Sequence, residues 1–492
     1  MKIKLPKKIF AAILLLLSGN LLLFLTIWLT GKYDQVYVDQ LIFQMKSSSE
    51  GVDSNLLNSA YVRVGLFGIV LTALETFLYK KLSRKYSLRN RALPLALAVL
   101  LVSATLFLSQ LNVLAYMETT ATESDFIEDH YVNPNTVSLR FPKQKRNLIY
   151  IFLESMENTF SDMTAGEPIT DNYIRELTAL ANGNINFSNT AGMGGAYSYL
   201  GTTWTAAAMA TQTSGIPVKM EVAADEDAYG AGEDFLPGIV SLGEILEQNG
   251  YAQCLLVGSD AEFHGRKEYF LQHGNYDIVD INSLKEGERL PEDYWVWWGF
   301  EDQKLFSFAK EELTRLAAGD QPFNFTMLTA DTHFPDGYEC PLCPDTYEEQ
   351  YANVLSCSSQ QVYEFISWIE QQPFYENTTI VISGDHLTMD AHFLDDIDED
   401  YTRTIYNCII NAPVTPLQEK ERKFGTFDMF PTTLAALGVN IEGDRLGLGT
   451  NLFSAKLTLT EIYGYEKLDE EIQKNSDFYN TKILEMIHES TS

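Results

Sequence analysis

The sequence predicts an α/β protein in which a bundle of three transmembrane helices precedes a domain with a mostly parallel central sheet flanked by helices. Two observations support this prediction. The long uncharged apolar runs are concentrated in the first 118 of the 492 residues. After them, short apolar runs of strand length alternate with longer stretches of helical pattern, which is typical of a parallel sheet covered by helices.

Three runs are long enough to span a membrane, because about 20 apolar residues cross the hydrocarbon core. They cover residues 9–30, 62–79 and 92–116, and the second contains Glu75. The first run is too long for the apolar part of a signal peptide and has no small-residue cleavage site behind it, so we expect it to remain as an anchor. Glu75 is expected to face a neighbouring helix or to lie near the interface.

The basic residues predict the orientation of these spans. Lysines precede the first span, and the loop between the second and third holds six basic residues and no acid. The loop at 32–61 has two lysines against Asp34, Asp39, Glu50 and Asp53. Cytoplasmic loops are enriched in Lys and Arg, so the N-terminus is expected in the cytoplasm and everything after residue 116 outside. The chain is thus predicted to be a multi-pass protein of the cell membrane with an extracytoplasmic catalytic domain.

We expect a membrane anchor at 1–117, a polar linker at 118–145, a catalytic domain at 146–458 and a charged helical tail at 459–492. The net charge of −32 argues against nucleic acid as a partner, because a polyanion would be repelled. Most of this charge serves solubility, although acidic groups are also oxygen ligands for divalent ions.

Continuous apolar runs are typical of strands buried on both faces of a parallel sheet. The expected strands are 147–153, 252–257, 324–328, 378–382 and 406–410. The helical patterns between them cover 239–249, 301–317, 347–371 and 429–437.

Polar residues follow four of these strands: Glu154, Asp260, Asp331 and the pair Asp385-His386. Ligands of parallel sheets bind beyond the carboxyl ends of the strands. A carboxylate beside an imidazole suits a divalent ion such as Mn²⁺ or Zn²⁺. The alternative for the Asp-His pair is a turn aspartate and a surface histidine.

The stretch 201–205 offers three hydroxyls, Thr202, Thr203 and Thr205, before an apolar run. A hydroxyl needs a base or a metal to become a nucleophile, and the chain has no Gly-x-Ser-x-Gly motif. One of the threonines is therefore predicted to be a metal-activated nucleophile; the alternative for each is helix N-capping.

Cationic groups follow two of the strands. His264, Arg266 and Lys267 lie behind the second strand and His333 behind the third. Together with a metal ion, such groups would bind a phosphate and stabilise the charge that develops during its transfer. The alternative is a solvated loop.

Three cysteines lie beyond the membrane segments, where disulfides can form. Cys340-Pro-Leu-Cys343 has the spacing of a zinc half-site, but no second pair completes it. A disulfide of Cys340 or Cys343 with Cys357 is therefore the favoured prediction. Cys254 and Cys408 lie in apolar runs and are expected to be buried thiols.

The motifs at 147–155, 201–205, 330–337, 383–386 and 427–432 resemble those of the lipoteichoic acid synthase and phosphoglycerol transferase family, within the alkaline phosphatase and sulfatase superfamily. The match is closest to the periplasmic-glucan phosphoglycerol transferases and covers about residues 146–453. The resemblance implies an alkaline-phosphatase-like fold and a divalent metal, Mn²⁺ in first place with Zn²⁺ or Mg²⁺ as alternatives. Its ligands would be Glu154, Thr202, Asp385 and His386.

The resemblance further implies that Thr202 takes a glycerol-phosphoryl group from phosphatidylglycerol, releases diacylglycerol and passes the group to a cell-surface glycan or teichoic acceptor. His333 matches a family histidine near the phosphate. The family's Trp-x-Arg element is absent, and His264, Arg266 and Lys267 are expected to replace it. A phosphoethanolamine transferase or a sulfatase on the same scaffold is the alternative, although a sulfatase needs Cys or Ser at the nucleophile. A third alternative is a non-catalytic surface module.

Overall fold

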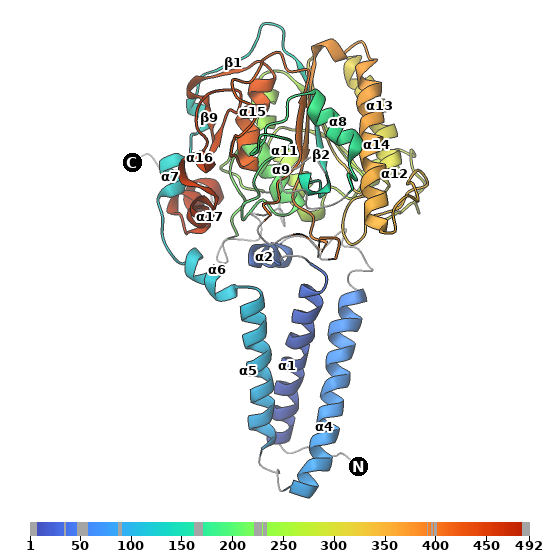
Figure 1. The fold of residues 1–492 in the computed structure, drawn as a ribbon, viewed down its shortest axis with the longest axis vertical. Helices are drawn as coiled ribbons and strands as arrows, with labels where there is room; N and C mark the ends of the chain where they lie inside the picture. The colour runs from blue at the N-terminus through green and yellow to red at the C-terminus, as the bar shows by residue number, and fades with distance from the viewer. Residues whose placement is uncertain are drawn as a thin grey trace. The chain divides into compact units, whose positions relative to one another are not determined.

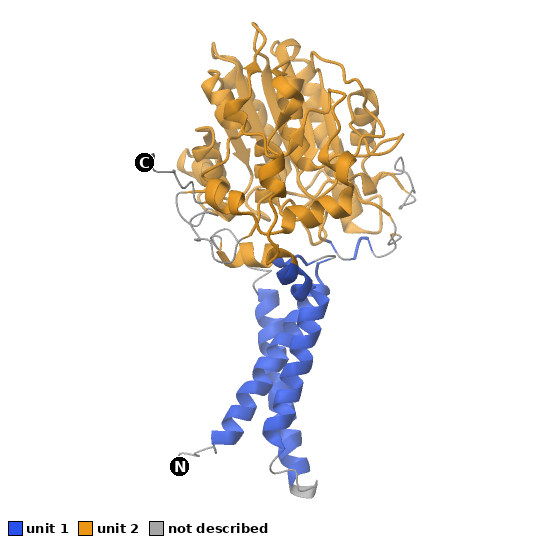
Figure 2. Cartoon of the chain, turned by 90° about the vertical axis from the view of Figure 1, so that its left-hand side faces the viewer, with its two compact units in different colours: residues 1–38, 52–118, 390–394 blue, residues 39–51, 119–389, 395–492 orange. Residues whose placement is uncertain are grey.

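The computed structural model describes residues 7–33, 36–46, 58–86, 91–161, 171–220, 229, 234–390, 392–394, 397 and 401–484. The chain forms two compact units (Figure 2). The first comprises residues 1–38, 52–118 and 390–394, and the second comprises residues 39–51, 119–389 and 395–492.

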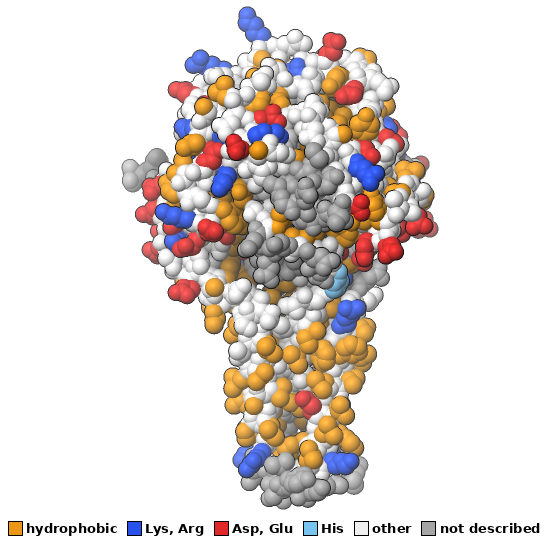
Figure 3. Space-filling view, viewed as in Figure 1, with side chains coloured by type: hydrophobic (Ala, Val, Ile, Leu, Met, Phe, Trp, Pro, Cys, Tyr) orange, Lys and Arg blue, Asp and Glu red, His pale blue; other side chains and the backbone are white. Residues whose placement is uncertain are grey.

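The first unit contains the apolar helices α1 (Lys7–Thr30), α4 (Phe67–Tyr86) and α5 (Ala92–Gln110). Among the described residues, three helices are long and apolar enough to cross a membrane, as the sequence predicts. Helices α1 and α5 approach closely at Gly19, where an added Cβ would lie 2.9 Å from Leu100 Cα. Figure 3 shows that hydrophobic side chains dominate the visible face of this unit. On the visible face of the second unit, Asp, Glu, Lys and Arg side chains are interspersed among the others.

Glu75 of α4 faces α1, one of the two positions expected for it. Asn20 Nδ2 donates to Glu75 Oε2 at 2.7 Å and to Thr72 Oγ1 at 3.0 Å. The orientation predicted from the charged residues stays a prediction. Several of the residues on which it depends lie outside the described part of the chain: Lys2, Lys4, Asp34, Glu50, Asp53 and Arg89.

The second unit is built on a six-stranded sheet with the strand order β4-β3-β5-β2-β6-β7. Its strands are β2 (Asn147–Leu153), β3 (Ala252–Val257), β4 (Asp277–Val279), β5 (Phe323–Leu328), β6 (Thr378–Gly384) and β7 (Asn407–Ile410). All neighbours are parallel except β7, which runs antiparallel to β6. The mostly parallel sheet is therefore confirmed. The sequence missed β4, because three residues are too few to show a pattern.

Two groups of helices accompany the sheet (Figure 1). One consists of α8 (Arg175–Gly183), α13 (Asp302–Ala317) and α14 (Gln350–Glu370), and the other of α9 (Thr205–Ser214), α10 (Leu242–Gln248) and α15 (Met429–Ala436). Shorter helices are α2 (Val38–Lys46), α6 (Val113–Thr120), α7 (Phe126–His130), α11 (Arg266–Gln272), α12 (Ile281–Glu286), α16 (Leu459–Tyr463) and α17 (Tyr465–Gln473). The short strands β1 (Leu139–Arg140) and β9 (Arg445–Leu446) pair with β8 (Asn440–Ile441) and β10 (Gly449–Thr450).

The expected linker and tail are more ordered than the sequence suggested. Within residues 118–145, Phe126 and Ile127 are buried and β1 pairs with β8. In the tail, Leu459 and Leu468 are buried in the same hydrophobic core as the strands. Apolar residues at helical spacing within charged segments bury one face of each short helix, so both segments pack as parts of the second unit.

Candidate metal centre and active site

Glu154, Asp385 and His386 meet at the carboxyl edge of the sheet. Strands β2 and β6 are parallel neighbours, and Leu153 pairs with Gly384, so the residues that follow them come side by side. One ligand atom from each of the three lies within 4.8 Å of the others. All three side chains are buried.

Hydrogen bonding fixes the state of the imidazole. His386 Nδ1 lies 2.8 Å from the Leu387 carbonyl oxygen, which can only accept, so Nδ1 carries the hydrogen. The other nitrogen, Nε2, lies 3.5 Å from Glu154 Oε1 and 3.4 Å from Asp385 Oδ2. Although burial opposes protonation, the charges of Asp385 and Glu154 raise the pKa of His386, so a proton on Nε2 is favoured when no metal ion is bound. A neutral imidazole would direct its lone pair at two carboxylate oxygens, and that arrangement needs a cation to be stable.

The buried carboxylates of Glu154 and Asp385 also require a neighbouring positive charge. Asp385 Oδ2 has no hydrogen-bond partner among the described residues. Burial and the charge of Glu154 raise the pKa of Asp385 to about 7. Burial would also raise the pKa of Glu154, but the charges of His333 and His386 hold it below its ordinary value. A divalent ion would satisfy these atoms together, so the donor set fits a metal site.

The threonine that reaches this cluster is Thr205. Its Oγ1 lies 3.3 Å from Glu154 Oε2 and 3.4 Å from His386 Nε2. Thr205 is the first residue of α9, and the preceding Trp204 provides no side-chain cap. The backbone N–H groups of the first turn therefore lie next to this hydroxyl without partners within the helix.

Thr202, the residue chosen from the sequence, is not brought to the cluster. Its fully buried Oγ1 donates to the Tyr199 carbonyl oxygen at 2.8 Å and accepts from the Tyr199 N–H at 3.0 Å. The hydroxyl thereby closes a tight turn. The structure therefore brings Thr205, and not Thr202, beside Glu154 and His386. The start of the apolar run at Ala206 is the sequence signal that marks the helix start.

Helix α2 supports the loop that leads to Thr205. Asp39 Oδ2 accepts from the Gly201 N–H at 3.1 Å, and Gln40 Nε2 donates to the Thr203 carbonyl oxygen at 2.7 Å. The Phe43 ring packs on Trp204 with centroids 5.0 Å apart. Gly201 has φ +80°, and an added Cβ would lie 2.6 Å from the Val218 oxygen, so this position requires glycine.

Beside the cluster lies a cavity that is open to solvent. Its polar and aromatic lining comprises Glu154, Thr205, Ser259, Phe263, His264, Arg266, Trp298, Thr329 and His333. The structure therefore brings three of the four predicted phosphate-binding residues to one cavity with Thr205.

Arg266 is the buried cation of this cavity. Its guanidinium donates to Ser259 Oγ at 2.9 Å and to the Asp260 carbonyl oxygen at 2.7 Å. Among the described residues it forms no ion pair with a carboxylate. Burial lowers its pKa to about 10, so the side chain is still charged at neutral pH. A buried guanidinium with neutral partners is suited to bind an anion.

The two histidines of the cavity are held differently. His333 Nδ1 lies 2.7 Å from the Phe334 carbonyl oxygen, which leaves Nε2 unprotonated when the ring is neutral. His264 Nε2 lies 2.9 Å from Gln44 Oε1 of α2, and burial together with Arg266 lowers its pKa to about 3. The sequence missed Trp298, whose ring lies 4.6 Å from that of His333, because a single Trp in a loop carries no pattern.

Lys267 does not join the cavity. Its Nζ forms an ion pair with Glu262 at 2.7 Å, and both side chains are partly exposed. Two of the strand-end acids are also used elsewhere. Asp260 Oδ1 accepts from the Glu262 N–H at 2.9 Å, and Asp331 Oδ1 accepts from the Asp302 N–H at 3.1 Å.

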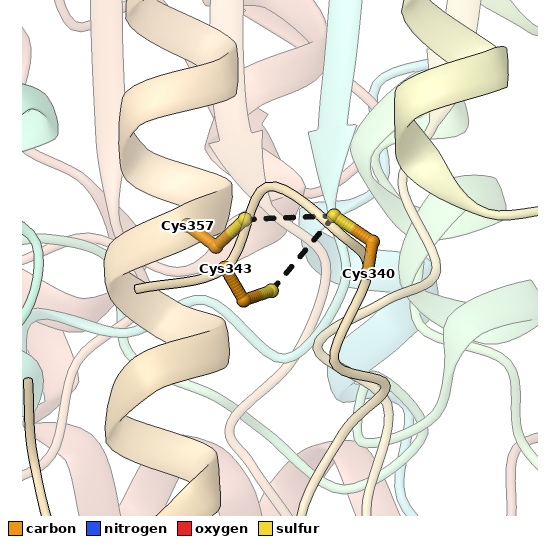
Figure 4. A group of neighbouring side chains, drawn as sticks. All are labelled: Cys340, Cys343 and Cys357. Atoms are coloured by element: carbon orange, nitrogen blue, oxygen red, sulfur yellow. Dashed lines mark hydrogen bonds between the residues drawn. The ribbon is translucent and has the colours of Figure 1, made fainter. Parts of the chain in front are cut away.

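The structure does not show the disulfide expected among Cys340, Cys343 and Cys357. All three are free thiols, and their sulfurs converge (Figure 4). Sγ of Cys340 lies 3.7 Å from that of Cys357 and 3.8 Å from that of Cys343. Cys254 and Cys408 are buried free thiols, as predicted.

The sequence pattern of the sulfatase family matches residues 146–439, more than half of the chain. The protein therefore belongs to the sulfatase family of enzymes, which confirms the resemblance seen in its motifs. Among its relatives, phosphoglycerol transferase I of Citrobacter koseri is 28% identical over 464 residues. That alignment covers 92% of this chain and 58% of the relative, so the chain spans little more than half the length of the curated relative.

Two solved structures share the fold. An alkaline phosphatase superfamily protein from Vibrio parahaemolyticus has a TM-score of 0.50 at 19% identity, covering 68% of this chain and 79% of its own. The integral membrane lipooligosaccharide phosphoethanolamine transferase A of Neisseria meningitidis has a TM-score of 0.50 at 14% identity, covering 89% and 85%. The expected alkaline-phosphatase-like fold behind membrane helices is confirmed.

Proposed function

We propose that the protein is a metal-dependent phosphoglycerol transferase. It moves a glycerol-phosphoryl group from phosphatidylglycerol to a hydroxyl of a cell-surface glycan or teichoic acceptor and releases diacylglycerol. The observation that carries the proposal is the Thr205 hydroxyl, 3.3 Å from Glu154 and facing a cavity that contains the buried Arg266. The relatives named phosphoglycerol transferase I support the choice of the transferred group.

In this proposal Glu154, Asp385, His386 and Thr205 hold one divalent ion, Mn²⁺ in first place. When bound, the ion favours the alkoxide of Thr205 and withdraws charge from the phosphoryl oxygens. The N-terminus of α9 adds its partial positive charge at the same hydroxyl. Arg266 binds the non-bridging phosphate oxygens and is the only arginine or lysine among the described residues that line the cavity.

The transfer proceeds in two displacements. Thr205 Oγ forms a bond to phosphorus as the bond to the diacylglycerol oxygen breaks. The hydroxyl proton that Thr205 directs at Glu154 Oε2 is released to solvent, and the diacylglycerol oxygen takes up a proton from water as it leaves. The acceptor hydroxyl then attacks the same phosphorus, and the Thr205 oxygen departs. The lone pair on Nε2 of His333 is the proton acceptor available within the cavity for the acceptor hydroxyl.

The experiment is incubation of the full chain in detergent with Mn²⁺ and labelled phosphatidylglycerol, with Thr205→Ala beside Thr202→Ala. Diacylglycerol release should disappear in Thr205→Ala and persist in Thr202→Ala, because only the Thr205 hydroxyl reaches the cluster. Equal release by wild type and Thr205→Ala would overturn the assignment. A parallel reaction with phosphatidylethanolamine tests the donor, and release from that lipid alone would make the protein a phosphoethanolamine transferase.

The proposal includes the orientation predicted from the basic residues, with the N-terminus in the cytoplasm and the residues after 116 outside the cell. A lipid donor and an envelope acceptor are both accessible there. A C-terminal tag should be cleaved by protease added to spheroplasts. Cleavage only after the cells are opened would contradict this placement.

A further inference from the structure

The three thiols of Cys340, Cys343 and Cys357 do not line the catalytic cavity, and their sulfurs lie close together. Cys340 and Cys343 belong to the segment that follows β5, and Cys357 lies about two turns into α14. Cys340 and Cys357 are buried, and Cys343 is partly exposed. Figure 4 shows the sulfurs directed toward one another.

The surroundings of these sulfurs supply hydrogen-bond donors. The Cys343 N–H donates to the Cys340 carbonyl oxygen at 3.0 Å, which closes a tight turn over Cys340-Pro-Leu-Cys343. Gln361 Nε2 lies 3.9 Å from Cys340 Sγ. Gln361 Nε2 donates to Cys357 Sγ at 3.4 Å. Donors around a sulfur favour a thiolate over a thiol.

The distances between the sulfurs distinguish zinc coordination from a disulfide bond. Sulfurs at about 2.3 Å from a tetrahedral zinc ion lie about 3.8 Å apart, whereas a disulfide requires about 2.05 Å. The two separations are 3.7 and 3.8 Å. All three sulfurs lie within 4.8 Å of one another. Cys357 therefore completes the half-site that the Cys-x-x-Cys spacing suggests.

We propose that Cys340, Cys343 and Cys357 bind one Zn²⁺ ion as thiolates, with water in the fourth position. Each thiol releases its proton on binding, and no oxidant is required. Within the described chain, the group contains no fourth Cys, His, Asp or Glu ligand, and the exposure of Cys343 leaves that position open to solvent. Three soft sulfur ligands select Zn²⁺ over the Mn²⁺ expected at the sheet edge.

The zinc ion would join the segment carrying His333 to α14. His333 lies seven residues before Cys340 on that segment and lines the catalytic cavity. The site is thus structural, and its existence does not depend on the proposed transferase activity.

The test is the metal and thiol content of the full chain, purified in detergent without reductant or chelator. Stoichiometric zinc should be present in wild type, in Cys254→Ala and in Asp385→Ala, and absent from Cys357→Ser. Cys254 is a matched control because it is a buried thiol of β3 outside the cluster. Asp385→Ala removes a ligand of the candidate metal site at the sheet edge. Zinc that remains bound to this variant is therefore assigned to the cysteine sulfurs.

Cobalt substitution gives a readout that does not depend on a variant folding. Wild-type protein loaded with Co²⁺ should show thiolate-to-cobalt charge-transfer absorption, which oxygen and nitrogen ligands cannot produce. Absence of that band would overturn the proposal. So would an intact mass lower by one pair of hydrogens, with a single thiol of the three open to alkylation, because a disulfide would then occupy the site.

Discussion

Within the described parts of the chain, two groups of three potential metal ligands come together, and they differ in chemistry and in the elements that place them. Glu154, Asp385 and His386 offer oxygen and nitrogen, and adjacent parallel strands place them. The cysteine group offers only sulfur, and a tight turn and a helix place it. Hard oxygen ligands suit Mn²⁺ or Mg²⁺ and sulfur suits Zn²⁺, so one chain can discriminate between ions by ligand type.

The surroundings separate their roles as well. The sheet-edge group borders a cavity with a buried cation and a hydroxyl at a helix N-terminus. No cysteine lines that cavity among its described residues. Convergence of ligands alone indicates a metal site, whereas an adjoining cavity with groups suited to a substrate indicates chemistry.

The largest effect is expected from Asp385→Ala. Loss of a carboxylate ligand should lower diacylglycerol release by about 10³-fold or more, because the ion activates the nucleophile and stabilises the phosphoryl charge. Zinc bound at the cysteines should be unchanged. Activity assays and metal analysis of the same sample check both statements, and simultaneous loss of zinc would show that the two groups are not independent.

Arg266→Ala should lower kcat/KM by about 10²-fold, because a buried guanidinium contact to the phosphate is lost. Lys267→Ala is the matched control, since the neighbouring lysine pairs with Glu262 outside the cavity. Its kcat/KM should stay within about twofold of wild type, as surface ion pairs contribute little. Equal losses of kcat/KM in both variants would contradict the assignment of the anion site to Arg266.

Cys357→Ser should lower kcat about 10-fold and leave the Mn²⁺ requirement in place. The zinc ion is proposed to position the segment with His333 without contacting substrate, and supporting contacts of this kind are typically worth 10- to 100-fold. Steady-state kinetics across a Mn²⁺ titration provide the measurement. A shifted Mn²⁺ requirement with unchanged kcat would contradict the separation of roles.

Gln40→Ala should lower kcat by up to about 10-fold through displacement of the loop before Thr205, since Gln40 donates to Thr203. Met45 lies on the same helix and is 83% exposed, so Met45→Ala serves as the control. Metal content should be normal in both. If the two variants behave alike, α2 does not position the nucleophile.

The smallest effect concerns Asp331, an acid that neither group uses. Burial and the charge of Asp302 raise its pKa well above the ordinary value. The native state therefore retains a proton that the unfolded chain releases above about pH 4, and its contribution to stability declines as pH rises above that value. Asp331→Asn should raise the apparent Tm at pH 8 by about 2 °C, and the gain should shrink toward pH 4. A gain that is constant across this range would mean that the carboxyl is ionised in the native state.

Much of the architecture could be predicted from the amino-acid sequence alone. The apolar runs identified the three membrane helices and five of the six strands of the sheet. The polar residues behind those runs identified Glu154, Asp385 and His386. This part is local: a residue directly after a buried parallel strand must emerge at the carboxyl edge, whatever the rest of the chain does.

Other features depended on packing between distant segments. Thr202 and Thr205 are equivalent as residue types, and only the turn at Tyr199 and the start of α9 direct one hydroxyl inward and the other to the cluster. Cys357 joins Cys340 across 17 residues, and Gln40 meets Thr203 across 163. Such contacts arise from side-chain direction and helix placement in the folded core, which a periodic pattern does not encode.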